Sequence, residues 1–163
     1  MIFLTVGTQL PFDRLVTAVD DWAGATGQQV FGQISDLGPE NYRPRHIEWV
    51  ARLAPEEFEA RYEAAPTVVA HAGMGTIIGA LTRGKPLLIM PRRADLGEQR
   101  NDHQIATADR FGTRPGIAVA NEAEDVAPAL DALGQKATAP SLGPYAEDTL
   151  IAAIRSTILP SGG

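Results

Sequence analysis

Apolar residues along the chain form short runs that alternate with stretches in which apolar positions recur at helical spacing. Residues 2–6 form an apolar run typical of a buried strand, and residues 11–25 place their apolar side chains on one face of a helix. Further strands are predicted over residues 29–34, 46–50, 67–70, 86–90 and 116–120, and further helices over residues 55–65, 74–82, 101–111, 122–133 and 145–158. Because such alternation implies right-handed crossovers, we expect a Rossmann-like, doubly wound α/β domain with a parallel sheet.

Composition and charge exclude several classes of function. The chain has 163 residues, enough for one domain with a substantial core. Its net charge of −6 argues against a surface that binds nucleic-acid phosphates. The absence of cysteine excludes disulfides, thiolate zinc sites and a cysteine nucleophile. No cluster of His, Asp and Glu has the spacing of a metal site, and no serine lies in a nucleophile elbow.

The sequence shows no recognisable targeting signal. No apolar run is long enough for a membrane span, and residues 1–6 lack the pattern of a signal peptide. We therefore expect a cytosolic protein with one domain over residues 1–159 and a loose tail over residues 160–163. A second domain is expected to be another chain.

Residues 71–76, with the sequence HAGMGT, directly follow a predicted strand and open a helix. Glycines there let a ligand approach the backbone, and the free N–H groups of the first helical turn favour an anion. The Thr76 hydroxyl adds a donor for a phosphate oxygen. The alternative is an ordinary helix start whose glycines serve packing, because the segment has neither the dinucleotide fingerprint nor a Walker lysine.

Two other segments are candidates for binding the same ligand. Residues 91–104, PRRADLGEQRNDHQ, follow the most apolar strand and are dense in groups that suit a hydroxyl-rich or acidic sugar. Ligands of open α/β sheets lie beyond the carboxyl ends of strands, where this segment begins. Residues 6–14 form a glycine turn that adjacent parallel strands would bring close to residues 71–76. The alternatives are a solvated loop with a helix cap for residues 91–104 and a plain tight turn for residues 6–14.

These motifs, taken in order, resemble the glycosyltransferase family 28 C-terminal domain. The resemblance rests on residues 71–76, on GKPLLIMPR at residues 84–92 and on NDHQ at residues 101–104, with residues 3–8 and 11–16 in support. It extends through at least residues 1–111. The most similar type is the small donor-binding subunit of split, two-subunit glycosyltransferases. Bacterial exopolysaccharide subunits look nearer than the donor subunit of the eukaryotic dolichol-linked N-acetylglucosaminyltransferase.

The resemblance implies a single GT-B C-terminal half-domain that binds a UDP-sugar as substrate, with no metal and no cofactor. It implies inverting transfer of glucuronic acid, galactose or N-acetylglucosamine to a lipid-linked acceptor in exopolysaccharide biosynthesis. The donor phosphates are expected at Gly7, Thr8, His71, Gly73, Met74, Gly75 and Thr76. The donor sugar is expected at Arg92, Arg93, Glu98, Asn101, His103 and Gln104, with Arg92 or Arg93 meeting a uronic acid carboxylate.

The resemblance also implies a partner. In this family the base that deprotonates the acceptor hydroxyl belongs to the other half, so no residue here is assigned as the catalytic base. A lone half-domain would leave its ligand exposed, whereas ligand sites bury most of their ligand. We expect an acceptor-binding, membrane-associated subunit that presents a polyprenyl-linked acceptor and holds this chain peripherally at the inner membrane.

One position departs from the family pattern. Many relatives carry an acid three residues after the Thr76 position, where it binds the ribose hydroxyls, and this chain has Gly79. Glu98 or a backbone group is the expected substitute, or nucleotide affinity is weaker. Two alternatives to a catalytic subunit stay open: a non-catalytic nucleotide-binding regulatory or scaffold subunit, and a sugar-nucleotide epimerase.

Overall fold

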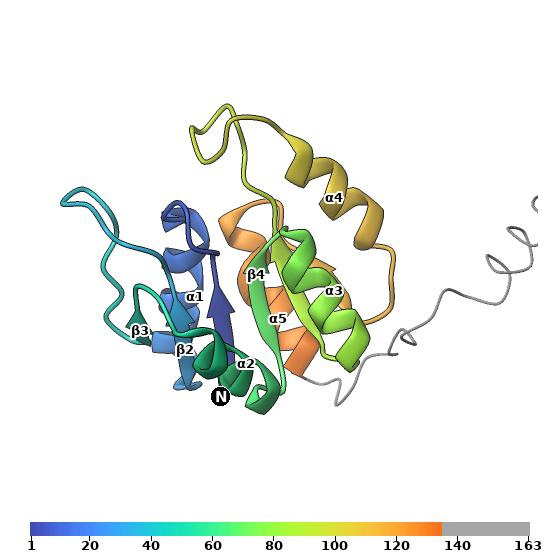
Figure 1. Cartoon of the computed structure of the whole chain (residues 1–163), viewed down its shortest axis with the longest axis horizontal. Helices are drawn as coiled ribbons and strands as arrows, with labels where there is room; N and C mark the ends of the chain where they lie inside the picture. The colour runs from blue at the N-terminus through green and yellow to red at the C-terminus, as the bar shows by residue number, and fades with distance from the viewer. Residues whose placement is uncertain (135–163) are drawn as a thin grey trace, which may run out of the picture.

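The computed structural model describes residues 1–134, in which one parallel sheet carries helices on both faces (Figure 1). The strands are β1 (Ile2–Thr5), β2 (Val30–Gln33), β3 (Glu48–Val50), β4 (Val68–His71), β5 (Leu87–Met90) and β6 (Ile117–Val119). The helices are α1 (Asp13–Thr26), α2 (Pro55–Ala64), α3 (Met74–Arg83), α4 (His103–Phe111) and α5 (Val126–Gly134), with a 3-10 helix η1 (Ala123–Asp125) before α5. The helix predicted over residues 145–158, the boundary at residue 159 and the tail over residues 160–163 lie outside the described residues.

The strand order is β3-β2-β1-β4-β5-β6, and every neighbouring pair is parallel. The chain builds the sheet outward from β1 to β3, then returns to place β4 beside β1 and continues to β6. This reversal confirms the predicted doubly wound fold. In such sheets the crevice beyond the carboxyl ends of the strands at the reversal is the usual ligand position.

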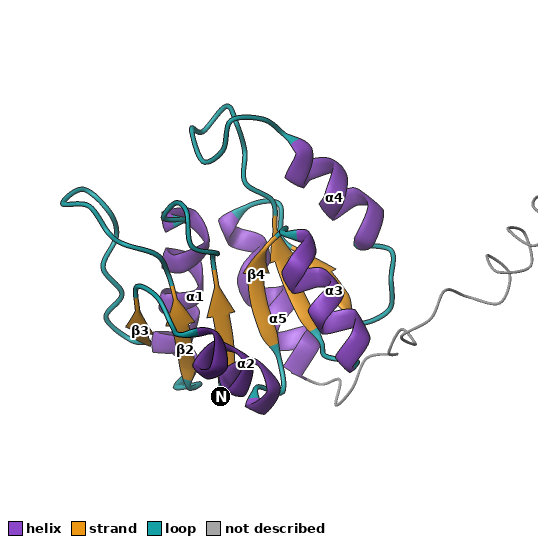
Figure 2. Cartoon of the chain, in the orientation of Figure 1, coloured by secondary structure: helices purple, strands orange, loops and turns teal. Residues whose placement is uncertain are grey.

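Helices α1 and α5 cover one face of the sheet, and α2, α3 and α4 cover the other (Figures 1 and 2). Successive side chains of a strand point to opposite faces, so Leu4 packs with α1 and α5 while Phe3 packs with α2 and α3. Residues 87–90 of β5 are fully buried on both faces. Coverage on both sides explains why β5 and the neighbouring central strands appear as continuous apolar runs in the sequence.

Two helix boundaries differ from the sequence prediction because side chains take over backbone hydrogen bonds. Helix α4 begins at His103 instead of residue 101, since Asn101 accepts from the His103 backbone N–H and Asp102 accepts from the Ala94 N–H at 2.8 Å. The helix predicted over residues 122–133 is divided into η1 and α5. The Asp125 carboxylate accepts from the backbone N–H groups of residues 121 and 122, both at 3.0 Å, which closes a separate tight turn.

A buried carboxylate, that of Asp20 in α1, anchors the second half of the long loop between β2 and β3. Asp20 is fully buried, and its two oxygens accept four hydrogen bonds of 2.7–3.0 Å. The donors are the Tyr42 hydroxyl and the backbone N–H groups of Arg45, His46 and Ile47. Burial by itself raises the pKa of Asp20, but these hydrogen bonds outweigh it and hold that pKa below its usual value.

Lys85 lies between α3 and β5, at the edge of the sheet where the strands begin, opposite their carboxyl ends. Its Nζ donates to the backbone oxygens of Glu63 at 2.7 Å and Ala65 at 2.9 Å, which are carbonyls at the C-terminal end of α2. A cation at a helix C-terminus satisfies carbonyls that have no partner within the helix. Lys85 therefore connects α2 to the strand that follows α3.

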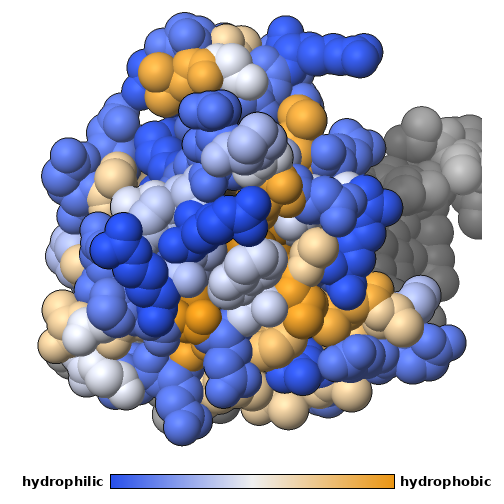
Figure 3. Space-filling model, turned by 90° about the vertical axis from the view of Figure 1, so that its left-hand side faces the viewer, coloured by the Kyte–Doolittle hydropathy of each residue, from blue (hydrophilic) through white to orange (hydrophobic). Residues whose placement is uncertain are grey.

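The side of the molecule nearest β3 is mainly hydrophilic, and its apolar residues form small separate patches (Figure 3). Over the described part of the chain, no helix combines the length and the apolar character needed to cross a bilayer.

Candidate functional site

The carboxyl ends of β1, β4 and β5 lie side by side, and the loops that follow them surround a cavity. Strand β4 pairs with β1 on one side and with β5 on the other, so the turn after β1 lies beside the start of α3, as the sequence predicted. The cavity has a volume of about 290 Å³. It is lined by Val6, Gly7, Thr8, Gln9, Leu10, His71, Gly73, Arg92, Gln99, His103 and Gln104. All three segments singled out in the sequence contribute to it.

The imidazole of His71 fits between two glycines in this cavity. A Cβ added to Gly73 would lie 2.4 Å from the His71 Nε2, and a Cβ added to Gly7 would lie 3.2 Å from its Cε1. Gly7 also has a backbone φ of +83°, which residues with a side chain rarely adopt. The glycines of the two motifs therefore leave room for one ring.

His71 is neutral at physiological pH. Burial and the nearby charge of Arg92 lower its pKa to about 4, and a weak interaction with the Thr5 backbone acts in the opposite direction. Its Nδ1 is buried and makes no well-formed hydrogen bond to the described residues. A neutral imidazole offers one N–H donor and one acceptor nitrogen, so His71 can contact a phosphate oxygen or a sugar hydroxyl through one N–H.

Helix α3 begins directly beside His71, and no side chain caps it. Gly73 is the N-cap residue and makes no side-chain cap bond, so the N–H groups of the first turn, residues 74–76, have no intrahelical acceptor. These N–H groups and the helix dipole favour an anion at this end. The Met74 side chain does not line the cavity and is 45% exposed.

Gly75 and Thr76, like Met74, do not line this cavity. They border a second space, a groove of about 310 Å³ between α2 and α3. Its other lining residues include Tyr62, Gly79 and Arg83. The Tyr62 hydroxyl donates to the Thr76 backbone oxygen at 2.9 Å. Gly79 has no side chain to fill this groove, and an added Cβ would contact the Tyr62 hydroxyl and an Arg83 guanidinium nitrogen, both at 3.3 Å.

The Arg92 side chain lines the cavity and is only 3% exposed. Its two terminal nitrogens donate to four backbone oxygens, at 2.7–3.3 Å. The acceptors belong to Val6, Leu10, Pro11 and Glu98. The terminal N–H groups predicted to meet a sugar carboxylate are thus already used within the protein.

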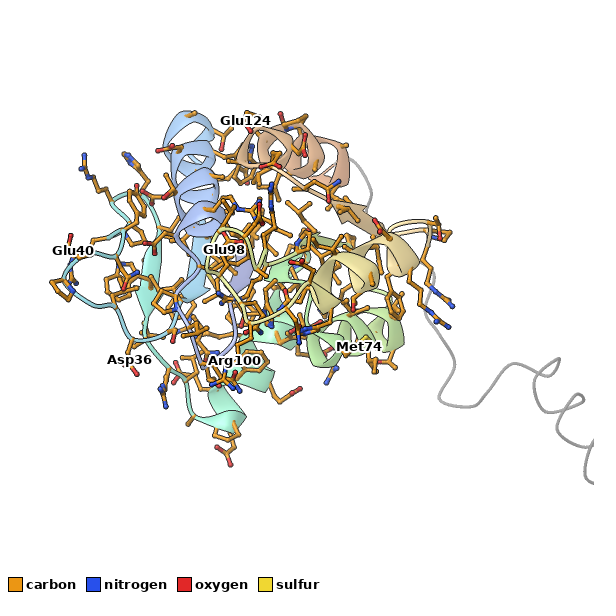
Figure 4. The ribbon with its side chains drawn as sticks, turned by 90° about the horizontal axis from the view of Figure 1, so that it is seen from above. Asp36, Glu40, Met74, Glu98, Arg100 and Glu124 are labelled. Carbon is orange, nitrogen blue, oxygen red and sulfur yellow. The ribbon has the colours of Figure 1, made fainter. Side chains whose placement is uncertain are left out.

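Glu98 and Arg93 do not line the cavity. Glu98 lies on the side of α1 (Figure 4). The Glu98 carboxylate accepts two hydrogen bonds from Arg14, at 2.9 and 2.8 Å, and one from the Arg93 N–H at 2.9 Å. The Arg93 guanidinium pairs with Asp95 at 2.7 Å and with Glu122 at 2.6 Å. Figure 4 shows Glu98 beside α1, whereas Met74 lies apart from it, at α3. Glu98 is therefore engaged with Arg14 and is not placed to replace the acid missing at Gly79.

The start of α4 supplies the remaining predicted residues. His103 is exposed and lines the cavity, while Asn101 contacts the His103 Nδ1 and does not line it. Gln104 is 3% exposed, lines the cavity, and accepts from the Arg92 backbone N–H at 3.1 Å through Oε1. His103 and Gln104 are thus the predicted sugar contacts that the fold brings next to His71.

Two glutamines of the cavity were not assigned from the sequence. Gln9 comes from the turn after β1 and Gln99 from the loop after β5. Both lie inside segments predicted to bind the ligand, and their amide side chains, which can bind sugar hydroxyls, are the feature of the sequence that could have identified them. The ion pair of Arg14 with Glu98 is not predictable from the sequence, because the two residues are 84 positions apart.

Within residues 1–134, no three His, Cys, Asp or Glu side chains come together in a way that could hold a metal ion. The polar side chains that line the cavity carry a hydroxyl, imidazoles, amides and one guanidinium, and such groups suit hydrogen bonding to phosphates and sugar hydroxyls.

Solved structures share this fold. The chain superposes on "CalG4, the Calicheamicin Glycosyltransferase" with a TM-score of 0.58 and 17% identity, covering 83% of this chain and 34% of that one. It superposes on the "Glycotransferase of kitacinnamycin" with a TM-score of 0.56 and 19% identity, covering 83% and 35%. The chain thus spans about a third of the length of these two proteins. The solution structure of ALG13 matches with a TM-score of 0.57 and 16% identity, over 94% of this chain and 93% of that one.

Sequence comparison identifies the family. No curated protein matches the chain. The family model of the "Glycosyltransferase family 28 C-terminal domain" matches residues 1–148, which include β1 to β6, α1 to α5 and all the residues of the cavity. The protein therefore belongs to the glycosyltransferase family 28 C-terminal domain family.

Proposed function

We propose that the chain is the donor-binding catalytic subunit of an inverting glycosyltransferase. It would bind a UDP-sugar and act with a partner that binds a lipid-linked acceptor in bacterial exopolysaccharide biosynthesis. The observation that carries this proposal is the convergence of the turn after β1, the uncapped start of α3 and the neutral His71 on one cavity. Membership in the family makes a nucleotide-activated sugar the natural ligand.

The diphosphate would lie between the turn after β1 and the start of α3. Gly7 and Thr8 face this space from one side, and His71 and Gly73 face it from the other. The first-turn N–H groups of residues 74–76 and one N–H of His71 would donate to phosphate oxygens. The protein's net charge of −6 makes this local arrangement of N–H donors, rather than overall attraction, the basis for binding an anion.

The sugar would lie toward the loop after β5 and the start of α4. His103, Gln104, Gln9 and Gln99 line this part of the cavity. Amides and imidazoles bind sugar hydroxyls by donating and accepting hydrogen bonds. Glucuronic acid, galactose and N-acetylglucosamine are all candidate sugars, and the charges of Arg92 and Arg93 do not select among them because both guanidinium groups are bound within the protein.

The chemical step would be a direct displacement at the anomeric carbon. The acceptor hydroxyl attacks that carbon, its proton passes to a base on the partner, and the bond to UDP breaks with the electron pair leaving on UDP. The fixed N–H groups at the start of α3 would stabilise the negative charge that develops on the departing diphosphate, which is a large catalytic effect in many enzymes. These groups would serve in place of a metal ion.

Exposed apolar side chains at the same edge support a partner there. Leu10, Met74 and Leu96 are 43%, 45% and 51% exposed and belong to the three segments that follow β1, β4 and β5. Apolar side chains gathered around a polar cavity are typical of an interaction site. A second subunit docked here would cover the donor and present the acceptor, and it would also bring the chain from the cytoplasm to the inner membrane.

A thermal-shift and calorimetric screen of UDP, UDP-sugars and GDP, on the chain alone and with its candidate partner, tests the proposal. UDP and one UDP-sugar should bind and GDP should bind more weakly. A ligand-bound structure should place the diphosphate at residues 71–76. Binding of UDP elsewhere, or sugar transfer by this chain without any partner, would contradict the proposal.

A non-catalytic nucleotide-binding subunit is a second candidate, favoured by Gly79, which leaves the groove beside α3 without the acid of many relatives. Sugar transfer by the partner measured with and without this chain separates the two. A catalytic subunit is required for turnover, whereas a regulatory subunit changes only its rate.

A further inference from the structure

The Arg92 guanidinium lies between segments that are far apart in the sequence. It reaches the end of β1 through the Val6 oxygen at 2.9 Å and the following turn through the oxygens of Leu10 and Pro11, both at 2.7 Å. It reaches the loop after β5 through the Glu98 oxygen at 3.3 Å. These acceptors belong to the two segments that follow β1 and β5, and they lie 6 to 86 residues from Arg92 along the sequence.

The guanidinium is also fixed in orientation. It lies over the ring of Phe12, with 4.5 Å between its central carbon and the ring centroid, and Phe12 is only 1% exposed. The Arg92 backbone N–H donates to Gln104, which lines the cavity. A planar guanidinium presents its N–H groups in a rigid fork, so one buried side chain can hold several carbonyls at set positions.

We propose that Arg92 is a positioning residue that fixes the turn after β1 and the loop after β5 relative to one another, so that the two walls of the cavity are held as one unit. This role concerns the ligand-free protein. Only its effect on donor binding rests on the proposed function. It gives Arg92 a role distinct from the sugar contact that the sequence suggested. Lysine could not take this role, because an ammonium group is a single point of charge on a flexible stem.

The charge of Arg92 adds an electrostatic consequence. The Glu98 carboxylate pairs directly with Arg14, and its charge also favours the charged form of Arg92, which it contacts only through its backbone oxygen. Burial lowers the pKa of Arg92 to about 10, so the guanidinium remains charged at neutral pH. A buried cation that lines the cavity favours an anion there, although the negative charge of Glu98 offsets part of this effect.

Hydrogen exchange of the ligand-free chain tests the positioning role directly. We would compare Arg92→Met and Arg92→Lys with the unchanged protein and with Arg110→Met. Arg110 is an exposed arginine of α4 whose side chain makes no hydrogen bond or ion pair within the described residues. Peptides covering residues 6–12 and 93–100 report the two walls, and a peptide covering α5 reports general stability.

In Arg92→Met both wall peptides should exchange about tenfold faster or more, as expected for the loss of several hydrogen bonds to a charged group, while α5 stays unchanged. Arg92→Lys should also loosen both walls, because charge alone does not restore the bridge, and Arg110→Met should match the unchanged protein. Unaltered exchange in both walls, faster exchange in only one of them, or an equal rise in α5 would overturn the proposal. If Arg92→Met does not fold, Arg92→Lys decides by the same criteria.

Calorimetry with UDP then separates this proposal from the proposed function. UDP affinity should fall about tenfold or more in Arg92→Met and Arg92→Lys and stay unchanged in Arg110→Met. If the unchanged protein does not bind UDP, the donor assignment fails and the exchange result still decides the role of Arg92. If both walls loosen but UDP affinity is unchanged, the extension of the proposal to donor binding is wrong.

Discussion

The space around His71 allows a sharp test, because the two glycines at the start of α3 have different surroundings. Gly73 has φ −88° and ψ 131°, which alanine adopts without strain, so Gly73→Ala would act only through its added methyl group. That methyl would lie 2.4 Å from the His71 Nε2 and 2.9 Å from its Cε1. At Gly75 nothing lies within 4 Å of an added Cβ.

The distances set the expected size of the effect. Favourable contacts between such atoms occur at about 3.5–4.0 Å, so the methyl overlaps the imidazole by more than about 1 Å. The ring must leave its place or the backbone must move, and overpacking of this kind costs about 1–3 kcal/mol. At roughly 2–4 °C per kcal/mol for a domain of this size, the melting temperature should fall by several degrees.

Binding should change more than stability. With the ring displaced and the methyl filling the space that faces the phosphates, UDP binding to Gly73→Ala should be lost in isothermal titration calorimetry. Gly75→Ala keeps the backbone N–H, and alanine is favoured over glycine in a helix, so it should bind UDP and gain up to about 1 kcal/mol of stability.

The outcome that would refute this reasoning is UDP binding to Gly73→Ala with the affinity of the unchanged protein. Equal losses in Gly73→Ala and Gly75→Ala would also contradict it, because they would mean that the ligand contacts the face of α3 at Gly75 and not the space beside His71.

Other residues give three further predictions. Because the folded chain holds the His71 pKa near 4 and the unfolded chain near 6.5, the stability given by the neutral ring is complete above pH 6.5 and is lost as the pH falls toward 4. Urea denaturation should show a loss of about 2 kcal/mol between pH 7.5 and pH 5, absent in His71→Asn. Asp20→Asn should lower the free energy of unfolding by about 3 kcal/mol or more in the same assay, because an amide nitrogen cannot accept the two hydrogen bonds that reach one carboxylate oxygen. Asp21→Asn, on the exposed side of α1, should lower it little. Arg93→Gln should leave the affinity for UDP-glucuronic acid unchanged in calorimetry, and a clear loss would return Arg93 to the sugar site.

The fold was predictable because its signal is local. Each predicted strand from residue 2 to residue 120 is present within about two residues of its expected ends, since a strand covered on both faces appears as a short apolar run. The meeting of the turn after β1 with the start of α3 followed from the parallel order. Helix starts were less predictable, because Asn101 and Asp125 use their side chains in ways that depend on the folded turn.

The site was predictable only in part. Glycine turns and a helix start can be recognised from residue types, and the fold places Gly7, His71 and Gly73 around one cavity. Their contact with a donor stays a prediction. The partners of Arg92 and Glu98 could not be predicted from the sequence. Arg92 donates to backbone carbonyls and Glu98 accepts from Arg14, and these partners lie up to 86 residues away, so the residue types in a polar loop do not indicate them.

The position of Lys85 has a consequence for interpreting the motif that contains it. A glycine followed by lysine, close behind a glycine-rich helix start, invites assignment as a phosphate ligand. Here the two motifs are separated by the full length of α3, and the ammonium group closes the end of α2 at the far rim of the sheet. Neutralising this lysine, by acetylation for example, should therefore weaken the attachment of α2 and leave unchanged the cavity at the opposite edge of the sheet, where we propose that the nucleotide binds.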